Sequence, residues 1–268
     1  MTVFRHELHF TDAGEAADLA AFLARLIHYD RAAAVRLQAG AGVLAVFGRP
    51  PSFEVLAIRT ARLEATVTEG ASGTLDTTVS AGEFADAVDT ARTAAADRNP
   101  SEGLAGGLVV TVPEAVTGPP WAGVLPPRGG WRRVSGLPGA DEVRGAVAAA
   151  VAEFRARDEA LPEERRTRAE RDRIGHEIWS RTLGETGLPL RAVHAAQSLG
   201  FLRPVRVAAP VTTTPGSSAV TTVPEPAPEP VAEPLAVLAA GGWLRLRTPY
   251  GSIAARTSGF PGLSVTPA

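Results

Sequence analysis

The chain has 268 residues, of which 45% are hydrophobic, and a formal net charge of −2. This composition supports a substantial core and excludes a chain that is disordered throughout. All 27 basic residues are arginine, which fits a high-GC bacterium, so an arginine cluster is weaker evidence for phosphate binding than usual. The absence of cysteine excludes disulfides, thiolate zinc sites and a cysteine nucleophile.

The chain reaches charged residues within its first seven positions, so the apolar stretch of a signal peptide is missing. No apolar span of about 18 residues follows later in the sequence. We therefore expect a cytoplasmic protein that does not interact with a membrane.

Residues 1–125 carry the pattern of an α+β domain. The segment from Val3 to Phe10 predicts a strand, and Asp12 followed by Glu15 indicates the start of an amphipathic helix. Four short runs then predict strands over residues 33–38, 43–47, 53–60 and 62–69. A strand over residues 74–80, a helix capped by Ser80 and a strand over residues 108–112 complete this part.

This order of strands around two helices places the helices on an antiparallel sheet. Together with the strand-to-helix step TTVSAGEFADAV at residues 77–88, this order resembles one repeat of a DNA sliding clamp. The resemblance covers roughly the first hundred residues. The chain departs from the clamp pattern because too few strands follow the second helix and no convincing repeat comes after it. The resemblance concerns architecture, so no residue roles are carried over.

Prolines and glycines crowd residues 113–140, and we place an irregular hinge at residues 126–140. Trp121 and Trp131 either form an exposed binding patch or pin this segment to the domain surface. We expect the second arrangement, because large aromatic side chains usually bury area.

Residues 141–206 are predicted to be mainly helical. Between Glu153 and Arg181 the chain holds eight arginines and eight acids. Three acids precede an arginine by four positions, in the pairs Glu153–Arg157, Glu164–Arg168 and Glu177–Arg181. This spacing and balance favour a solvated, ion-paired helix surface over a strip that binds phosphates.

The five histidines and the glycine-rich pieces give no catalytic signature. His6 and His9 are three apart on a presumed strand and point to opposite faces, so they do not chelate one ion readily. The dinucleotide, P-loop, zincin and nucleophile-elbow spacings are all missing. We therefore predict no catalytic residue, no cofactor and no metal.

A helix that begins near Pro189 and stops at Gly200 resembles the first helix and turn of helix-turn-helix domains. Residues 207–234 are rich in proline, and we interpret them as a disordered linker that extends by up to about 3 Å per residue. We hypothesise that the linker's acids, Glu225, Glu229 and Glu233, shield the arginines of the segment that follows.

Residues 235–268 predict a hairpin that turns at Thr248–Gly251 and completes the C-terminal domain. Leu244 and Leu246 alternate with Arg245 and Arg247, so one face packs and the other is positive. Helices followed by an arginine-bearing hairpin are typical of winged-helix-like units.

The sequence thus predicts an α+β protein, with an N-terminal antiparallel sheet and two packed helices before a mainly helical C-terminal region with a terminal β-hairpin. We expect a non-enzymatic protein that binds double-stranded DNA or a protein partner, and self-association is left open. The alternatives are a structural or protein-interaction scaffold and, third, an enzyme of unknown class. The predicted binding residues are Arg191, His194, Gln197, Arg245, Arg247 and Arg256.

Overall fold

A computed structural model of the chain describes residues 6–64, 75–97, 108–204 and 235–257. The first elements are β1 (Glu7–Phe10), α1 (Ala13–Tyr29), β2 (Ala34–Gly40), β3 (Val43–Gly48), β4 (Leu56–Arg62), β5 (Leu75–Ser80), α2 (Ala81–Ala96) and β6 (Leu108–Thr111). They are followed by a 3-10 turn (Pro120–Gly123), β7 (Arg132–Val134), α3 (Ala140–Glu159), a second 3-10 turn (Glu163–Arg165), α4 (Arg168–Trp179), α5 (Leu190–Ser198), β8 (Ala236–Ala240), β9 (Trp243–Thr248) and β10 (Gly251–Arg256). Helices and antiparallel sheets occur together, which confirms the α+β class.

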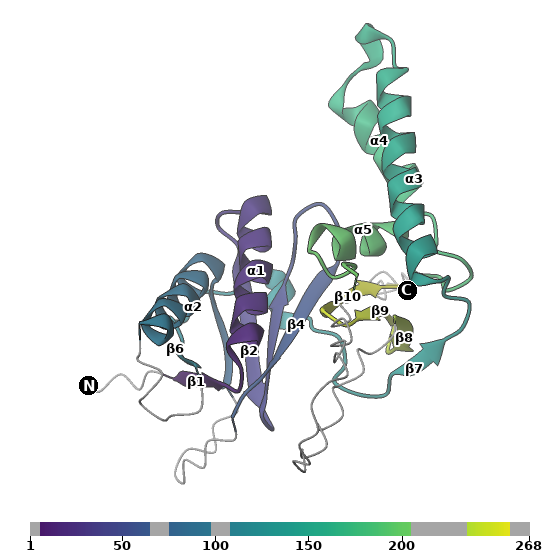
Figure 1. Ribbon diagram of the computed structural model, residues 1–268. Helices are drawn as coiled ribbons and strands as arrows, with labels where there is room; N and C mark the ends of the chain where they lie inside the picture. Colours follow the sequence, from purple (N-terminus) through teal and green to yellow (C-terminus); the bar gives the residue numbers. More distant parts are fainter. Residues whose placement is uncertain (1–5, 65–74, 98–107, 205–234, 258–268) are drawn as a thin grey trace, which may run out of the picture.

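One antiparallel sheet of eight strands runs through the molecule in the order β5-β2-β3-β4-β10-β9-β8-β7, and β1 and β6 form a separate pair (Figure 1). The predicted helix starts are confirmed. The Asp12 carboxylate accepts the amide hydrogen of Gly14 at 2.8 Å, and the Ser80 hydroxyl accepts that of Glu83 at 3.4 Å. The structure does not show the strand that was predicted to begin at residue 62. Strand β4 ends at Arg62, and residues 65–69 lie outside the described part.

The C-terminal hairpin lies inside the sheet. Sequence analysis expected it to complete the C-terminal region alone, but β10 pairs with β4 through Ser252–Ile58 and Ala254–Leu56, and β9 pairs with β8. The physical reason is that both β4 and β10 bury successive residues on their two faces. Such strands require neighbours on both sides and cover on both faces. The hairpin is therefore not a free wing, and the sheet crosses the predicted boundary at residue 125.

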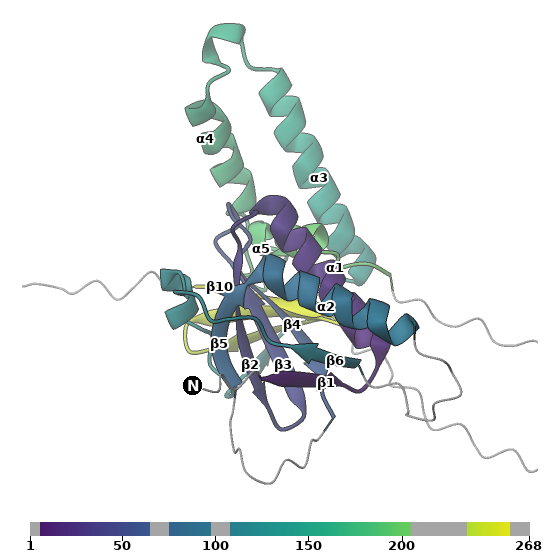
Figure 2. The same ribbon diagram turned by 90° about the vertical axis from the view of Figure 1, so that its left-hand side faces the viewer.

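Helices α1, α2 and α5 cover one face of the sheet (Figures 1 and 2). The core beneath them joins α1 to the turn after α5 through the stacked rings of Phe22 and Phe201, whose centroids are 5.6 Å apart. Leu246 and Ile253 of the hairpin belong to the same core. The C-terminal hairpin and the N-terminal helix therefore share one apolar interior.

The opposite face is covered by a segment that we call the strap, residues 113–131. Trp121 and Trp131 pack there against a small apolar cluster that includes Phe47 and Trp243. The Trp131 indole also donates a hydrogen bond to the carbonyl of Pro127 at 2.9 Å. Both tryptophans thus pin the segment to the sheet, as expected.

The hinge predicted at residues 126–140 contains a strand that sequence analysis did not find. Strand β7 pairs with β8, with Arg133 opposite Leu238 and Val134 opposite Val237. Its partner lies about a hundred residues later in the chain, so local alternation could not reveal it. The expectation of an irregular segment is wrong at these three residues.

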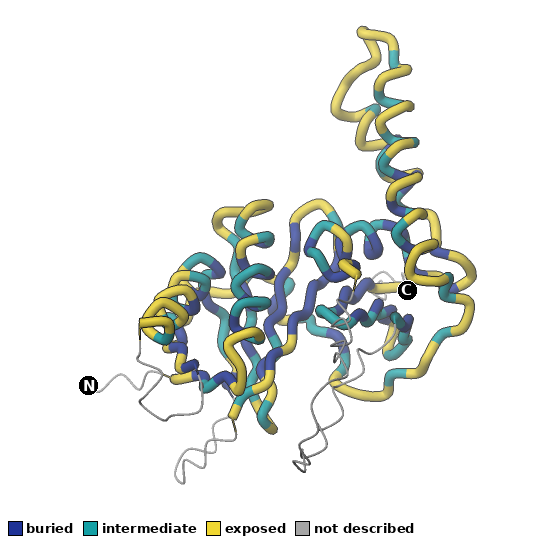
Figure 3. Tube along the Cα trace, in the orientation of Figure 1, coloured by how far each residue is buried: buried dark blue, intermediate teal, exposed yellow. Residues whose placement is uncertain are grey.

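Helices α3 and α4 form an arm that projects from the body, exposed over most of its length (Figures 1 and 3). Ion pairs join α3 to α4 and to the residues just after it, with Arg157 to Glu177 at 2.7 Å, Arg181 to Glu153 at 2.6 Å and Arg171 to Asp158 at 2.8 Å. The hydrogen bond from Arg157 lowers the pKa of the Glu177 carboxyl to about 2. The predicted surface of paired charges is confirmed.

The three predicted pairs fare differently. Glu153–Arg157 and Glu177–Arg181 form at 3.3 Å and 3.6 Å. Glu164 instead lies in a 3-10 turn, where spacing by four residues does not bring side chains together, and Arg168 contacts Asp172 at 3.7 Å.

None of the helices in the described residues is long and apolar enough to cross a membrane.

Candidate partner-binding site

The structure separates the six predicted binding residues into two groups. Arg191, His194 and Gln197 lie on α5, which packs on the face of the sheet that Leu246 enters. The guanidinium of Arg245 points to the other face, where it lies 5.7 Å from the centre of the Trp131 ring on the strap. The two groups therefore do not form one continuous surface.

The strap partly covers one of the hairpin arginines, Arg245. Arg245 donates a hydrogen bond to the Ser252 hydroxyl at 2.9 Å, and burial, together with the nearby charge of Arg247, lowers the pKa of its guanidinium. Arg256 is exposed and lies 5.2 Å over the Trp243 ring. The positive face predicted by the Leu-Arg alternation exists, but tryptophan rings line it.

Aromatic side chains from four parts of the chain meet around His194. Its imidazole stacks on Trp179 of α4, with ring centres 4.4 Å apart and planes 21° apart. Phe53 of the β3–β4 loop meets the imidazole edge-on at 5.2 Å, and Tyr29 at the end of α1 meets Phe53 at 5.8 Å. This contact chain links the arm, α5 and the N-terminal half.

The β3–β4 loop that carries Phe53 has a strained backbone. Ser52 and Glu54 have φ angles of 70° and 52°, which residues other than glycine rarely adopt. Each such residue costs about 1–3 kcal/mol, and strain of this kind gathers at ligand clamps and switch regions. Phe53 is held toward His194 at the expense of this strain.

A cleft of about 550 Å³ opens beside these rings, and we call it the His194 cleft. Its lining residues are Ser52, Phe53, Glu54, Phe154, Arg171, Asp172, Gly175, His176, Trp179, Ser180, Arg191 and His194. The volume lies within the range of about 300–1,000 Å³ typical of binding sites. Aromatic walls and charges of both signs therefore face one opening.

One polar group of α5 is left without a hydrogen-bond partner in the cleft, and a second, His194, is perturbed by burial. The buried Nε of Arg191 has no hydrogen-bond partner in the described structure, and the Glu54 carboxylate lies 3.7 Å away. Burial lowers the pKa of the His194 imidazole below its usual value of 6.5. His194 is consequently neutral at pH 7, and its ring presents an uncharged, stacked surface.

We expect His194 to make folding less favourable in acid. Its folded-state pKa is lowered, so the unfolded chain binds the proton more readily, and the contribution to stability is present above about pH 6.5 and lost as the pH falls through the folded-state value. Urea unfolding at pH 7.5 and pH 5 should show a smaller loss of stability in His194→Gln than in the parent chain. The exposed His176 is the control, and an equal pH response of His194→Gln and His176→Gln would contradict the assignment.

Sequence analysis found two residues of the cleft and missed its aromatic walls. Arg191, His194 and Gln197 were all predicted to bind a partner. Arg191 and His194 are only partly exposed, while Gln197 is exposed. Trp179 was placed only within the predicted helical region 141–206, and Phe53 was assigned to a strand over residues 53–60. The signal for Phe53 was the preceding Arg49-Pro50-Pro51, which marks a constrained loop.

Groups of three or more histidine, aspartate or glutamate side chains that could hold a metal ion do not occur within the described residues.

The fold and the cleft together define an α+β protein built on one continuous antiparallel sheet, with a projecting helical arm and an aromatic cleft at its base.

Residues 126–260, half of the chain, match the family described as domain of unknown function DUF8185, and the chain belongs to this family. Residues 4–123 match a second family, described as domain of unknown function DUF8010. The border between the two matches falls close to residue 125, where sequence analysis placed its first boundary. No curated protein matches the chain.

Proposed function

We propose that this protein is a non-enzymatic cytoplasmic scaffold that docks a partner protein in the His194 cleft. The observation that carries the proposal is the strained loop that holds Phe53 against His194, which itself stacks on Trp179, at an open cleft. Aromatic residues and arginine are the side chains most enriched at the centres of protein interfaces. The cleft offers both, because Arg191 lies at its wall beside the rings.

The charges around the cleft favour a protein over a nucleic acid. Arg171 and Arg191 are accompanied by Glu54 and Asp172, so the lining has no net positive excess from these four residues. In the adjoining arm, arginines such as Arg157 and Arg181 are already paired with carboxylates. A polyanion gains little affinity at such a surface. Its phosphates bind by pairing with cationic side chains, and these arginines already have carboxylate partners.

A photo-crosslinking amino acid at position 53 tests the proposal. We expect a discrete adduct in cells that is destroyed by protease and resists nuclease. The same substitution at Val109, which is 38% exposed on β6, is the matched control. An adduct that is destroyed by nuclease, or equal adducts from both positions, would contradict docking of a protein in this cleft.

A second candidate is binding of double-stranded DNA through the hairpin. It is favoured by Arg256 and Arg49, which line a pocket of about 290 Å³ together with Trp121 and Trp243. We expect this activity to appear as a salt-dependent mobility shift with duplex DNA that is lost in the triple variant Arg49→Ala, Arg245→Ala and Arg256→Ala. A shift that persists in that variant would exclude this surface.

The hypothesis that Glu225, Glu229 and Glu233 shield the hairpin concerns residues outside the described part of the chain. It stays a prediction, as do the extended linker over residues 207–234 and self-association of the chain. Deleting residues 210–232 should strengthen binding of a polyanion at low salt if the acids shield the arginines. Unchanged binding would contradict the shielding.

A further inference from the structure

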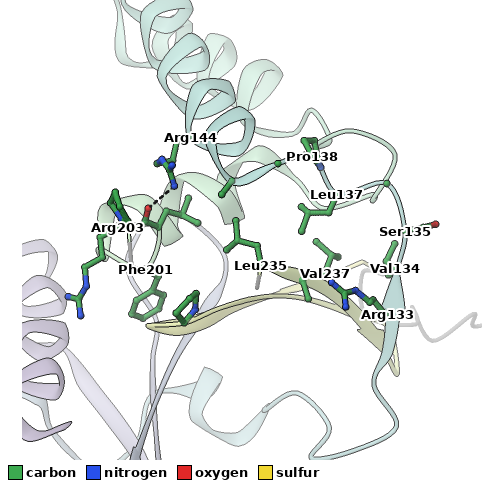
Figure 4. Close-up of a pocket in the computed structure, with 17 residues that line it drawn as sticks. Arg133, Val134, Ser135, Leu137, Pro138, Arg144, Phe201, Arg203, Leu235 and Val237 are labelled. Carbon is green, nitrogen blue, oxygen red and sulfur yellow. Dashed lines mark hydrogen bonds between the residues drawn. The ribbon is translucent and has the colours of Figure 1, made fainter. Parts of the chain in front are cut away.

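A hollow of about 600 Å³ lies at the foot of the arm, between β7, the start of α3 and the start of β8 (Figure 4). Its arginines are not available to an occupant. Arg144 and Arg203 are paired with aspartates, and Figure 4 shows the Arg203 side chain directed away from the floor. Arg133 pairs with Leu238, which also pairs with Arg245, so its side chain points to the strap face. We therefore assign this hollow no occupant.

A smaller pocket of about 290 Å³ lies on the strap face of the sheet, and we call it the tryptophan pocket. The strand register explains why its walls meet, because Leu56 of β4 pairs with Ala254 of β10, and Trp243 of β9 pairs with Arg256 of β10. The pocket thus forms where the C-terminal hairpin joins β4. Its lining residues are Arg49, Glu54, Val55, Leu56, Pro120, Trp121, Val124, Trp243 and Arg256.

The walls of the tryptophan pocket are apolar and aromatic. Leu56 and Trp243 are buried, and Trp121 and Val124 of the strap pack against the same small apolar cluster. Because Trp121 is only partly buried and lines the pocket, part of its indole faces the opening. Aromatic rings favour offset-stacked or edge-to-face contact with a second ring. A flat aromatic group therefore matches these walls.

Two guanidinium groups accompany these walls. Arg256 lies 5.2 Å over the centre of the Trp243 ring, which places its charge beside the apolar surface. Arg49 is exposed and forms no ion pair within the described residues. The one acid in the lining is Glu54, and its carboxylate lies 3.7 Å from Nε of Arg191 on α5, so its charge is partly offset from outside the pocket. The pocket therefore carries an excess of positive charge.

We propose that the tryptophan pocket binds a small aromatic carboxylate. The ring rests against Trp121 and the apolar wall, and the carboxylate accepts hydrogen bonds from Arg49, with the charge of Arg256 nearby. Arginine suits this task because its planar guanidinium binds a carboxylate through two parallel hydrogen bonds. The volume lies at the lower end of the range of about 300–1,000 Å³ typical of ligand sites, which suits a molecule of one or two rings. This ligand site goes beyond the proposed docking of a partner in the His194 cleft.

Ligand-observed NMR titrations of the full chain with 2-naphthoate test the pocket. We expect 2-naphthoate to bind about tenfold more tightly than 2-naphthamide, which keeps the rings but lacks the charge. The cationic 2-naphthylmethylamine should not bind measurably. Equal affinities of the acid and the amide would show that the apolar walls act alone, which contradicts the proposal. Displacement of 2-naphthoate by an equal concentration of inorganic phosphate would also contradict it, because the site would then accept any anion.

The double variant Arg49→Gln and Arg256→Gln should bind 2-naphthoate about five- to tenfold more weakly and leave the affinity for 2-naphthamide nearly unchanged. The control variant Arg31→Gln and Arg132→Gln removes the same charge from exposed positions outside the lining, and it should bind as the parent chain does. Equal losses in the two double variants would overturn the proposal, since the effect would then come from the net charge of the chain.

The variant Trp121→Leu tests the aromatic wall. It keeps an apolar side chain but removes the indole, so we expect binding of 2-naphthoate to weaken about two- to tenfold. Binding of the saturated acid cyclohexanecarboxylate should change little, which also shows that the pocket is still formed. An equal loss for the saturated acid would mean that the pocket does not select a ring, contrary to the proposal.

Duplex DNA is the competing occupant of Arg49 and Arg256. A mobility shift that depends on these two arginines, together with a chain that does not bind 2-naphthoate, would assign them to the second candidate function and overturn the proposal. None of these titrations needs a partner protein. Failure to bind 2-naphthoate therefore leaves docking at the His194 cleft standing, and failure of crosslinking from position 53 leaves the tryptophan pocket standing.

Discussion

Replacing Arg59 with alanine is expected to lower the free energy of unfolding by about 3 kcal/mol, the lower end of the range for breaking a buried ion pair. The side chain is only 9% exposed in the middle of the sheet. Its guanidinium donates one hydrogen bond to Asp18 of α1 at 2.9 Å and another to the carbonyl of Tyr250, which precedes β10. Arg59 therefore connects the N-terminal helix, β4 and the C-terminal hairpin at one point.

The lower end of the range applies because Asp18 keeps a second partner. Arg203 pairs with its other carboxylate oxygen at 2.7 Å, so removal of Arg59 does not leave that charge isolated. The carbonyl of Tyr250 does lose its donor, and the missing side chain leaves a cavity beneath α1. These two losses make up most of the expected effect.

Arg62 supplies the matched control for this measurement. It also lies on β4 and pairs with Glu15 at 2.9 Å, but its side chain is 64% exposed. Arg62→Ala should cost less than about 1 kcal/mol, because exposed ion pairs are weak. Urea unfolding followed by circular dichroism compares the two variants. Similar costs would mean that Arg59 does not act as a buried junction.

Replacing Gly251 with alanine is expected to cost about 2–4 kcal/mol, through backbone strain together with steric overlap. Gly251 opens β10 with a φ angle of 150°, and an added Cβ would lie 2.7–2.9 Å from three atoms of the Phe201 ring. That ring is buried and stacks on Phe22, so it has little room to move. The close approach of the hairpin to the turn after α5 thus depends on a residue without a side chain.

A substitution at Gly130 separates the cost of backbone strain from the cost of steric overlap. Its φ angle of 76° is also unfavourable for alanine, but an added Cβ there meets nothing within 4 Å. Gly130→Ala should therefore cost about 1 kcal/mol, the lower end of the range for backbone strain. Thermal unfolding of both variants measures the difference. If Gly251→Ala is no more destabilising than Gly130→Ala, the packing of Phe201 on the hairpin is looser than the described geometry.

The candidate site was only partly predictable. The sequence placed three predicted binding residues, Arg191, His194 and Gln197, on one helix, and they lie together on α5. It could not show that Trp179 and Phe53 cover two of them, because these side chains come from other elements. The arginine face of the hairpin was predicted correctly, but the sequence did not reveal that Trp131 of the strap lies against Arg245.

The sequence by itself determined the features that depend on neighbouring residues. These are the capped helices α1 and α2, the ion-paired arm, and the alternation of Leu244 and Leu246 with arginines in β9, all of which follow from caps and periodicity over a few positions. Only the tertiary structure decided that β10 joins β4, that Arg132–Val134 becomes a strand, and that the two groups of predicted binding residues face opposite sides of the sheet. Strand partners far apart in the chain are selected by the burial of both faces and edges at once, and no local pattern records that choice.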